Sequence, residues 1–599
     1  MTMRDLWQYI LSLFSFDSSH PLLFTQIHFW VLFLFIYAGF ALITGRQRKP
    51  GARQTLRNAY LFAFSLLFYY KTSGLFVLLL VGSTLTGWLL GIGMDRLKHG
   101  RKAMCAAGVV LNLAVLCFFK YAYFFLDIFN ATFHTEHSIG IKILLPVGIS
   151  FFTFQNISYI VDVYRRKIAH VGNILDFGFY TAFFPQLVAG PILRADQFVP
   201  QLYRPFFLSR RQFGVAVFWI CNGLIKKLVL SDYLAVSFVD RVFENPLLYT
   251  PFENLSALML YSLQVYADFS GYTDIAIGVA MLMGFYLPVN FNSPYKAQNP
   301  TDFWHRWHMS LSRWLRDYLY IPLGGNRSAG FLSYFLLFLI LAIAAFRLQS
   351  TWFTVAAVAV AAAVLMLLAF RPSHRRTLGT NVNNMDTMLL GGLWHGASFN
   401  FITWGGLNGL GILAYKWWHP LPKARRVATV VTLALVLTVA RGLVESALLN
   451  VLAVTAAVAA VAITLLECIR APRLYKAWNI LFTFVFISFT RLFFRSGSNL
   501  DPAEANEVAW QTASQMMGQI GSAWNLRQVP EIVGSYWQVF LLFALGMAVH
   551  WLPTRFKRRY RLWFAQMPLW LMGLFVVLMA LVLYQFVTAD LQPFIYFQF

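Results

Sequence analysis

The sequence has few charged residues and few cysteines, and it lacks two motifs that mark many soluble enzymes. Only 12% of its 599 residues are charged and 59% are hydrophobic, a composition that excludes an ordinary soluble protein. The four cysteines are widely spaced and form no Cys-x-x-Cys pair, so neither a zinc site nor a disulfide framework is indicated. The absence of a Gly-x-Ser-x-Gly elbow and of a Walker loop argues against serine-based hydrolysis and against ATP hydrolysis by this chain.

Long apolar runs dominate the chain instead. Many are continuous over 17 or more mostly apolar residues, long enough for a helix to cross a bilayer and unlike the alternating strands of a barrel. We therefore predict an all-α polytopic membrane protein. The first run, about 23–44, is too long for a cleaved signal peptide and is expected to stay as an anchor. The further spans are predicted near 58–70, 74–93, 103–126, 141–162, 174–192, 213–231, 331–346, 351–370, 427–441, 443–466, 478–494, 534–552 and 567–588.

Basic residues outnumber acidic ones by 48 to 24. One interpretation is positive-inside loops, and the other is a basic surface for an acidic polymer. The basic residues gather in short loops such as 45–57 and 94–102, which favours the first interpretation. These loops would be cytoplasmic and both termini periplasmic. Membrane lipids are then the expected surroundings, and no nucleic-acid partner is expected.

Four segments are not predicted to be simple spans. Residues 252–286 are too long for one straight span, and 287–326 combine four prolines with many aromatic and charged residues. Such a segment must be irregular or re-entrant backbone that is buried in protein or lines a cavity. Residues 497–531 form a polar stretch, which we interpret as a solvated loop, with a partner contact as the alternative. Residues 1–20 suit a short interfacial helix.

His395 lies in the apolar stretch Gly391-Gly-Leu-Trp-His-Gly-Ala397. An ionisable side chain at membrane depth is costly and is therefore a functional candidate. The alternative is a structural histidine that is hydrogen-bonded across helices. The small residues around it, with Gly405 and Gly409, favour close helix packing over a nucleotide-binding loop.

A second candidate segment holds His305 and His308, which would share one face if the segment is helical. A metal pair would need a third ligand, and none is evident nearby in the sequence. Trp304 lies in the same segment. The arginines Arg306, Arg313 and Arg316 suit either the phosphates of a substrate or phospholipid headgroups, whereas Asp268, Asp274 and Asp317 are expected to pair with basic groups.

Several longer motifs together resemble the membrane-bound O-acyltransferase family, in its alginate O-acetyltransferase branch. They cover about half of the chain. The motifs are Pro185-Gln-Leu-x-Ala-Gly-Pro-Ile192, Gln264-x-Tyr-x-Asp-Phe-Ser-Gly-Tyr-Thr-Asp274, Pro288-x-Asn-Phe-Asn-x-Pro-Tyr295, Asp302-Phe-Trp-His-Arg-Trp-His-Met-Ser-Leu-Ser312, Arg316-Asp-Tyr-Leu-Tyr-Ile-Pro-Leu-Gly-Gly-Asn-Arg327, Asn384-Met-x-Thr-Met-Leu-Leu-Gly-Gly-Leu-Trp-His-Gly-Ala397 and the tail Pro593-Phe-Ile-Tyr-Phe-Gln-Phe599.

The resemblance implies a helical bundle with a central funnel and acyl transfer to a hydroxyl group. In it, His395 matches the family's central histidine and His308 matches a second polar position. A supporting or donor-binding role is predicted for Trp304, His305, Arg306, Arg316, Asp317, Asn384 and Trp394. No bound cofactor and no metal are predicted, and acetyl-CoA or another acyl thioester is the expected donor.

Imidazole titrates near neutrality, so His395 suits a general base, with an acyl-histidine intermediate as the alternative. His308 would polarise the thioester carbonyl or orient the acceptor. The predicted organisation is N-terminal transmembrane helices (1–140), a catalytic core (141–326 and 381–418), inserted hairpins (327–380 and 427–470), and C-terminal transmembrane helices (478–599) with an extramembrane loop (497–531).

The leading hypothesis is an inner-membrane O-acetyltransferase for an exported, alginate-like polysaccharide. By resemblance, its partners are periplasmic esterase-like (SGNH) acetyltransferases and the polysaccharide export machinery. The alternatives are acylation of cellulose, teichoic acid or peptidoglycan by the same chemistry. A polysaccharide transporter, for which paired broken helices would be expected, and a scaffold in which His395 is dispensable are the hypotheses from other classes.

Overall fold

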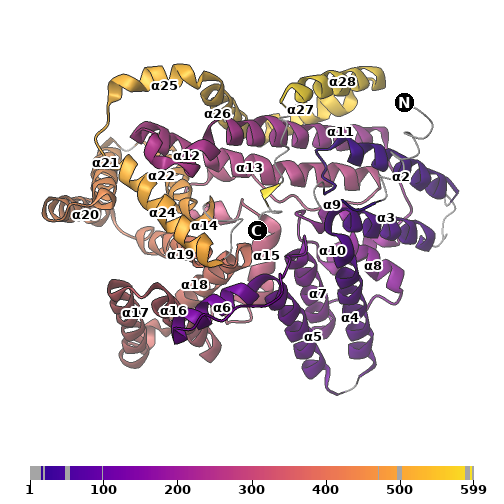
Figure 1. Ribbon diagram of the computed structural model, residues 1–599, viewed down its shortest axis with the longest axis horizontal. Helices are drawn as coiled ribbons and strands as arrows, with labels where there is room; N and C mark the ends of the chain where they lie inside the picture. Colours follow the sequence, from indigo (N-terminus) through magenta and orange to yellow (C-terminus); the bar gives the residue numbers. More distant parts are fainter. Residues whose placement is uncertain are drawn as a thin grey trace.

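The computed structural model describes residues 15–17, 21–46, 54–97, 99–469, 471–495, 502–586 and 594–595. Within these residues the protein consists of helices joined by turns and contains no strand (Figure 1). In this part of the chain ten helices are long and apolar enough to cross a membrane, or eleven if a bent pair near residues 526–551 forms one more span. The predicted all-α, multi-pass membrane fold is confirmed. Most of the expected interfacial helix in 1–20 and of the tail motif lies outside the described residues.

The N-terminal helices follow the predicted spans closely, but the second one is longer than predicted. It begins at Thr55 because polar residues at its start find partners inside the protein. Arg57 donates to the backbone oxygens of Leu202 and Arg204 at 2.8 and 2.9 Å, and Asn58 donates to Asp176 at 2.7 Å. The helices are α2 (Ile27–Arg46), α3 (Thr55–Ser73), α4 (Val77–Arg96), α5 (Arg101–Leu116) and α6 (Ala122–Phe133).

The middle of the chain forms the buried centre. The predicted span 174–192 is broken instead into short helices, and residues 252–286 contain one continuous helix of 32 residues, α13, despite its polar side chains. The polar residues Asp268 and Asp274 are buried there and pair with Lys227 and Lys226, each at 2.6 Å. The elements are α7 (Ile149–Tyr164), α8 (Ile174–Ala182), α9 (Phe184–Leu187), α10 (Ala195–Leu202), α11 (Arg210–Ile225), η3 (Lys226–Asp232), η4 (Ala235–Val239), α12 (Asp240–Glu244) and α13 (Pro251–Leu282).

Residues after α13 form the irregular segment that the prolines predict. Only short helical pieces occur in it: η6 (Pro294–Lys296), α14 (Pro300–Trp304), α15 (Met309–Leu315) and η7 (Arg316–Tyr320). Backbone bonds across the loop, such as Asn292 N–H to the oxygen of Arg306 at 2.9 Å, satisfy polar groups that have no helix to satisfy them.

Two helical hairpins leave the central bundle, as predicted. The first is α16 (Phe331–Leu348) with α17 (Thr351–Phe370), and the second is α20 (Lys423–Leu443) with α21 (Ala447–Ile469). In Figure 1, α17 and α20 lie at the edge of the molecule. Most apolar side chains of α17 and α20 are exposed to the surroundings, which is the pattern of helices that face lipid.

The segment 497–531 is not the solvated loop that its polarity suggested. It contains a helix of 19 residues, α24 (Pro502–Ile520). Ala505, Ala509, Ala513 and Met516 are buried along one face of this helix, and that face packs against α13, α19 and α21. The apolar positions repeat at helical spacing, which the overall polarity of the segment had hidden.

The C-terminal helices complete the molecule. Beyond α18 (Arg375–His395) and α19 (Phe399–Trp418), the chain forms α22 (Pro472–Thr490), α23 (Leu492–Arg495), α25 (Val529–Ser535), α26 (Trp537–Trp551), α27 (Thr554–Gln566) and α28 (Leu569–Phe586). The helix α27 lies beside α11 (Figure 1). The described end of the chain, Phe594 and Ile595, returns to α13, where the Ile595 N–H donates to Asp268 at 2.7 Å.

Glycines bring α11 and α13 into direct backbone contact. A β-carbon on Gly278 would lie 2.6 Å from the backbone oxygen of Ala216, and one on Gly223 would lie 2.5 Å from the backbone oxygen of Gly271. These distances leave no room for a methyl group. Small residues that allow such close approach are a main device of helix packing in membranes.

We expect Gly278→Ala to destabilise the protein by about 1–3 kcal/mol, the range for overpacked sites, because backbone cannot move aside as a side chain can. Gly573→Ala on α28 is the control, since nothing lies within 4 Å of its added carbon. Unfolding of the purified proteins in mixed micelles, followed by tryptophan fluorescence, measures both. Equal stability of the two variants would contradict the close contact.

Candidate active site

His395 is the last residue of α18, and the chain turns back at once into α19. Gly396 and Ala397 form the turn, and Ser398 precedes α19. The His395 side chain is buried, with 3% of its surface exposed. A histidine at the end of a helix, followed by glycine, can thus be placed deep in the protein without a long loop.

Glycines set the spacing between α18 and α19. A β-carbon on Gly392 would lie 2.3 Å from the oxygen of Phe401, and one on Gly405 would lie 2.3 Å from the oxygen of Met388. The predicted packing of this glycine-rich region through small residues is confirmed.

Lys120 and Tyr121 hold the end of α18 from the other side. Both lie in η2 (Cys117–Tyr121). The Lys120 ammonium donates to the backbone oxygens of Trp394 and His395 at 2.6 and 3.2 Å, and the Tyr121 hydroxyl donates to that of Leu393 at 2.9 Å. They satisfy carbonyl groups that the helix end leaves open. The sequence analysis missed both residues, although a lone lysine in an apolar span was a signal.

His308 occupies a strained turn between α14 and α15. Its backbone is left-handed, with φ of 44°, so His305 and His308 do not share a helical face as the spacing suggested. His305 is exposed and lies on the other side of the turn from the buried His308. Such strain in a non-glycine residue needs support from its surroundings.

Asn290 supplies this support. Its carboxamide oxygen accepts hydrogen bonds from the backbone N–H and the hydroxyl of Ser310, at 3.0 and 2.9 Å, and lies 3.3 Å from Nδ1 of His308. Its backbone oxygen accepts the N–H of Met309 at 2.9 Å. The Ser310 hydroxyl oxygen in turn accepts the N–H of Ile192 at 3.0 Å. Three of the sequence motifs therefore meet at this turn.

The two histidines lie next to each other. Their ring centroids are 6.3 Å apart, and Trp394 contacts both, at 6.0 Å from His308 and 4.9 Å from His395. Two further aromatic rings pack against His395. The ring centroids of Trp404 and Phe494 lie 5.1 and 5.5 Å from that of His395. The side chains from α18 and from the α14–α15 turn thus converge.

A small cavity borders His395. It is lined almost entirely by apolar and aromatic side chains, and its volume is about 10 Å³, close to the space of a single water molecule. Its polar side chains are few: His395, Asn408 and Arg491, and Trp304 is one of the three tryptophans that line it. The remaining lining residues are Val265, Phe269, Phe303, Trp307, Trp404, Ile487, Phe494 and Ile595. Arg491 and Asn408 are functional candidates that the sequence analysis missed.

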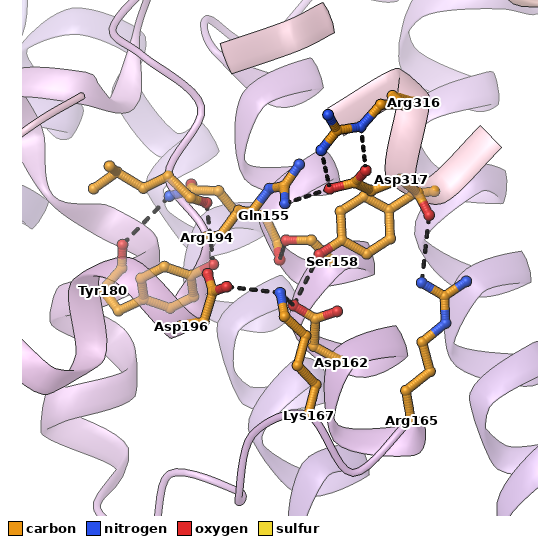
Figure 2. Close-up of polar contacts among 12 residues, drawn as sticks. Gln155, Ser158, Asp162, Arg165, Lys167, Tyr180, Arg194, Asp196, Arg316 and Asp317 are labelled. Carbon is orange, nitrogen blue, oxygen red and sulfur yellow. Dashed lines mark hydrogen bonds and ion pairs between the residues drawn. The ribbon is translucent and has the colours of Figure 1, made fainter. Parts of the chain in front are cut away.

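Arg316 and Asp317 lie away from this cavity in a charged network (Figure 2). Asp317 pairs with Arg316 at 2.6 Å and with Arg194 at 2.7 Å. Partial burial alone would raise the pKa of the Asp317 carboxyl, but the hydrogen bonds and charges of the two arginines outweigh it and lower that pKa. Close by, Lys167 bridges Asp162 and Asp196 at 3.3 and 2.6 Å. The network joins η7 to α7 and α10, and the prediction that Asp317 pairs with basic groups is confirmed.

Two further candidates also lie outside the cavity lining. Asn384 is eleven residues before His395 on α18, which places it about 16 Å away along the helix. Its amide donates to the Thr380 oxygen at 2.5 Å and to the Tyr320 hydroxyl at 3.2 Å. Arg306 pairs with Asp302 at 2.7 Å. In the part of the chain that the structure describes, no three His, Cys, Asp and Glu side chains are grouped to hold a metal ion.

The turn after His395 is also tied to α24. Asn506 of α24 accepts the backbone N–H of Asn400 at 3.1 Å, and the Asn400 amide donates to the Phe493 oxygen at 2.9 Å. The helix that replaced the expected loop therefore supports the site.

The sequence is similar to known proteins over about two thirds of its length. The family model described as "MBOAT, membrane-bound O-acyltransferase family" matches residues 108–386, which include His308 and end nine residues before His395. The probable alginate O-acetylase AlgI of Pseudomonas aeruginosa is 36% identical over 398 residues, which cover 65% of each chain. The protein of the same name from Pseudomonas putida is 37% identical over 399 residues, covering 65% of this chain and 70% of that protein.

A relative with another name is similar over the same extent. The peptidoglycan O-acetyltransferase of Helicobacter pylori is 31% identical over 418 residues, covering 64% of this chain and 69% of that protein. The chain thus spans about two thirds of the length of these curated relatives. On the family match and on these relatives together, the chain belongs to the membrane-bound O-acyltransferase family.

Proposed function

We propose that this protein is a membrane O-acetyltransferase that moves an acetyl group from a cytoplasmic thioester donor to an exported, alginate-like polysaccharide. The observation that carries the proposal is the pairing of His395 and His308, 6.3 Å apart beside an apolar cavity, in a chain of this family. The names of the Pseudomonas relatives support acetate as the acyl group and alginate as the polymer.

In this reaction His395 acts as the general base. It takes the proton of the acceptor hydroxyl while the hydroxyl oxygen bonds to the carbonyl carbon of the thioester. The carbon–sulfur bond then breaks, and the thiolate leaves with the proton that His395 returns. The products are an O-acetyl ester and a free thiol. The aromatic walls around His395 keep water out, so that the acyl group goes to the acceptor and is not hydrolysed.

The hydrogen bonds of Asn290 support one of the two roles considered for His308. The Asn290 oxygen accepts from Ser310, so it must also act as the acceptor toward His308, whose Nδ1 then carries the hydrogen. In the neutral ring the lone pair is therefore on Nε2. A nitrogen with a lone pair accepts a hydrogen bond, so His308 orients the acceptor hydroxyl and does not polarise the thioester carbonyl.

The donor's phosphates are best placed near Arg306. Arg316 and Arg194 share the charge of Asp317, whereas Lys296, Lys476 and Arg306 together have only Asp302 as an acidic partner among the described residues. Burial lowers the pKa of Lys296, and the nearby charges of Arg306 and Lys476 lower it further. This unbalanced positive charge adjoins α14, whose Phe303 and Trp304 line the cavity. Coenzyme A carries phosphates that such a surface attracts.

The membrane placement follows the charge distribution. Basic loops at 45–57 and 94–102 favour the cytoplasmic side of the membrane. The protein would then lie in a bacterial inner membrane with both termini on the periplasmic side. Periplasmic esterase-like acetyltransferases and the polysaccharide export machinery are the proposed partners, because the finished ester must appear on a polymer outside the cell.

His395→Ala should reduce O-acetylation of the polymer by about 10²–10⁴-fold, the usual contribution of a positioned acid or base. His308→Ala should reduce it by about 10²-fold, the cost of a misplaced reacting group. His305→Ala is the matched control, since this histidine is exposed on the same segment and should retain normal acetylation. The O-acetyl content per sugar, measured by NMR on polymer from cells with equal amounts of membrane-inserted protein, is the readout. Normal acetylation by His395→Ala would reject the function. Loss of acetyl groups from peptidoglycan instead would identify the other acceptor, which the Helicobacter relative's name suggests.

Replacing Lys296 and Lys476 by glutamine should raise the KM for acetyl-CoA several-fold, with little change in kcat, because the two cations attract the donor before the chemical step. The effect should be largest at low salt, where charges are least screened. The charge-matched control replaces two exposed lysines elsewhere, Lys102 and Lys142, by glutamine. The rate of acetyl transfer in inverted membrane vesicles is measured at several salt concentrations. An equal rise of KM in the control variant would contradict a phosphate-binding role for Lys296 and Lys476.

A further inference from the structure

Arg491 is a buried cation beside His395. It lies between α22 and α23, only 3% of it is exposed, and it lines the same cavity as His395. Burying a charge in such a place has a large desolvation cost. The contacts of Arg491 therefore indicate which function offsets this cost.

One side of the guanidinium is fixed. Its Nη1 donates to the backbone oxygen of Ser262 at 3.0 Å and to the hydroxyl of Tyr295 at 2.5 Å. The guanidinium carbon lies 4.4 Å from the ring centre of Trp307, within the range of a cation–π contact. These contacts set its position and leave Nε and Nη2 for other partners.

The charge of Arg491 is not balanced by an acid. Among the described residues, no carboxylate lies within 4 Å of Arg491, and neither Nε nor Nη2 makes a hydrogen bond. Arg495, four residues later on α23, shows the contrast, because it pairs with Asp240 at 2.8 Å. A purely structural arginine at this depth is expected to have such a partner. The positive charge of Arg491 is therefore available to a negative charge that forms during the reaction.

The size of the cavity limits what this charge can contact. A volume of about 10 Å³ admits a group the size of a water molecule. A sugar ring with its carboxylate is far larger, but the carbonyl oxygen of an acetyl group fits.

From these observations we propose that Arg491 holds the carbonyl oxygen of the acyl group in the His395 cavity and stabilises its negative charge during transfer. The inference rests on the proposed acyl transfer and adds a catalytic residue to it. When the acceptor oxygen bonds to the carbonyl carbon, the electron pair of the C=O double bond moves onto the oxygen beside Arg491. When the carbon–sulfur bond breaks, the pair returns and restores the carbonyl. Arg491 gives up no proton, and the hydroxyl proton moves through His395 to the thiolate.

The test compares full-length variants in inverted membrane vesicles that contain the polymer machinery and are supplied with acetyl-CoA. Arg491→Gln should lower kcat by about 10²–10³-fold, as the loss of an oxyanion donor does, with little change in KM for acetyl-CoA. Arg491→Lys keeps the charge and should be at least tenfold faster than Arg491→Gln. Arg491→Ala should regain activity when methylguanidinium is added, because the small cation can occupy the vacated space.

Arg495→Gln is the control for a merely structural effect. It removes a neighbouring arginine that serves an ion pair, so it should lower thermal stability, show no response to methylguanidinium and retain kcat per folded molecule. Wild-type kcat in Arg491→Gln, or loss of activity in all three Arg491 variants that follows their loss of folded protein without any response to methylguanidinium, would overturn the role of Arg491. Failure of the wild type itself to transfer acetyl groups from acetyl-CoA, by contrast, would overturn the proposed function and the inference with it.

Discussion

The carboxamide of Asn290 is the contact on which the geometry of the histidine pair depends. His308 can lie opposite His395 only because its backbone takes a left-handed turn, and the Asn290 side chain and backbone bind three groups of that turn: the N–H and hydroxyl of Ser310 and the N–H of Met309. In water these groups would find other partners. Inside a membrane protein no water is available to bind these backbone and hydroxyl groups. The turn is therefore stable only while Asn290 binds them. The same amide fixes which ring nitrogen of His308 carries its hydrogen, and a structural contact thereby also determines chemical behaviour.

Two cations, Lys120 and Arg491, lie close to the reacting centre. Lys120 contacts the end of the helix that carries His395, and Arg491 lines the cavity beside it, whereas the buried aspartates Asp268 and Asp274 are each paired with their own lysine. Acyl transfer passes through a negatively charged tetrahedral state. In surroundings of aromatic side chains, where charges are poorly screened, fixed cations favour that state more strongly than water would. The free-energy cost of burying these two cations is offset by the packing of the helices in the rest of the fold.

Much of the fold follows from the sequence, because a membrane leaves few alternatives. Apolar length predicted the spans, and glycines around His395 predicted close packing of α18 on α19. Predictions from local residue spacing were wrong where tertiary contacts determine the backbone. The i, i+3 spacing of His305 and His308 indicated a shared helical face, but the turn at His308 separates them. The polarity of 497–531 suggested a loop, yet its alanines line one face of a helix. Arg491 and Lys120 could not be assigned, because each is far from His395 in the sequence and only the folded chain brings them to it.

The site is built from residues that are spread over about two thirds of the chain. Lys120, Asn290, His395, Arg491 and Asn506 come from elements spread over almost four hundred residues, so shifting any one of them would disturb the cavity. The outer helices of the two hairpins, α17 and α20, lie at the edge of the molecule (Figure 1), whereas α16 packs on α6 and α18, and α21 packs on α24. An excursion whose ends stay close costs little in loop entropy, and the lipid-facing helices of a hairpin satisfy their own backbone. The exposed apolar side chains of α17 and α20 therefore set the surface that the protein presents in the membrane.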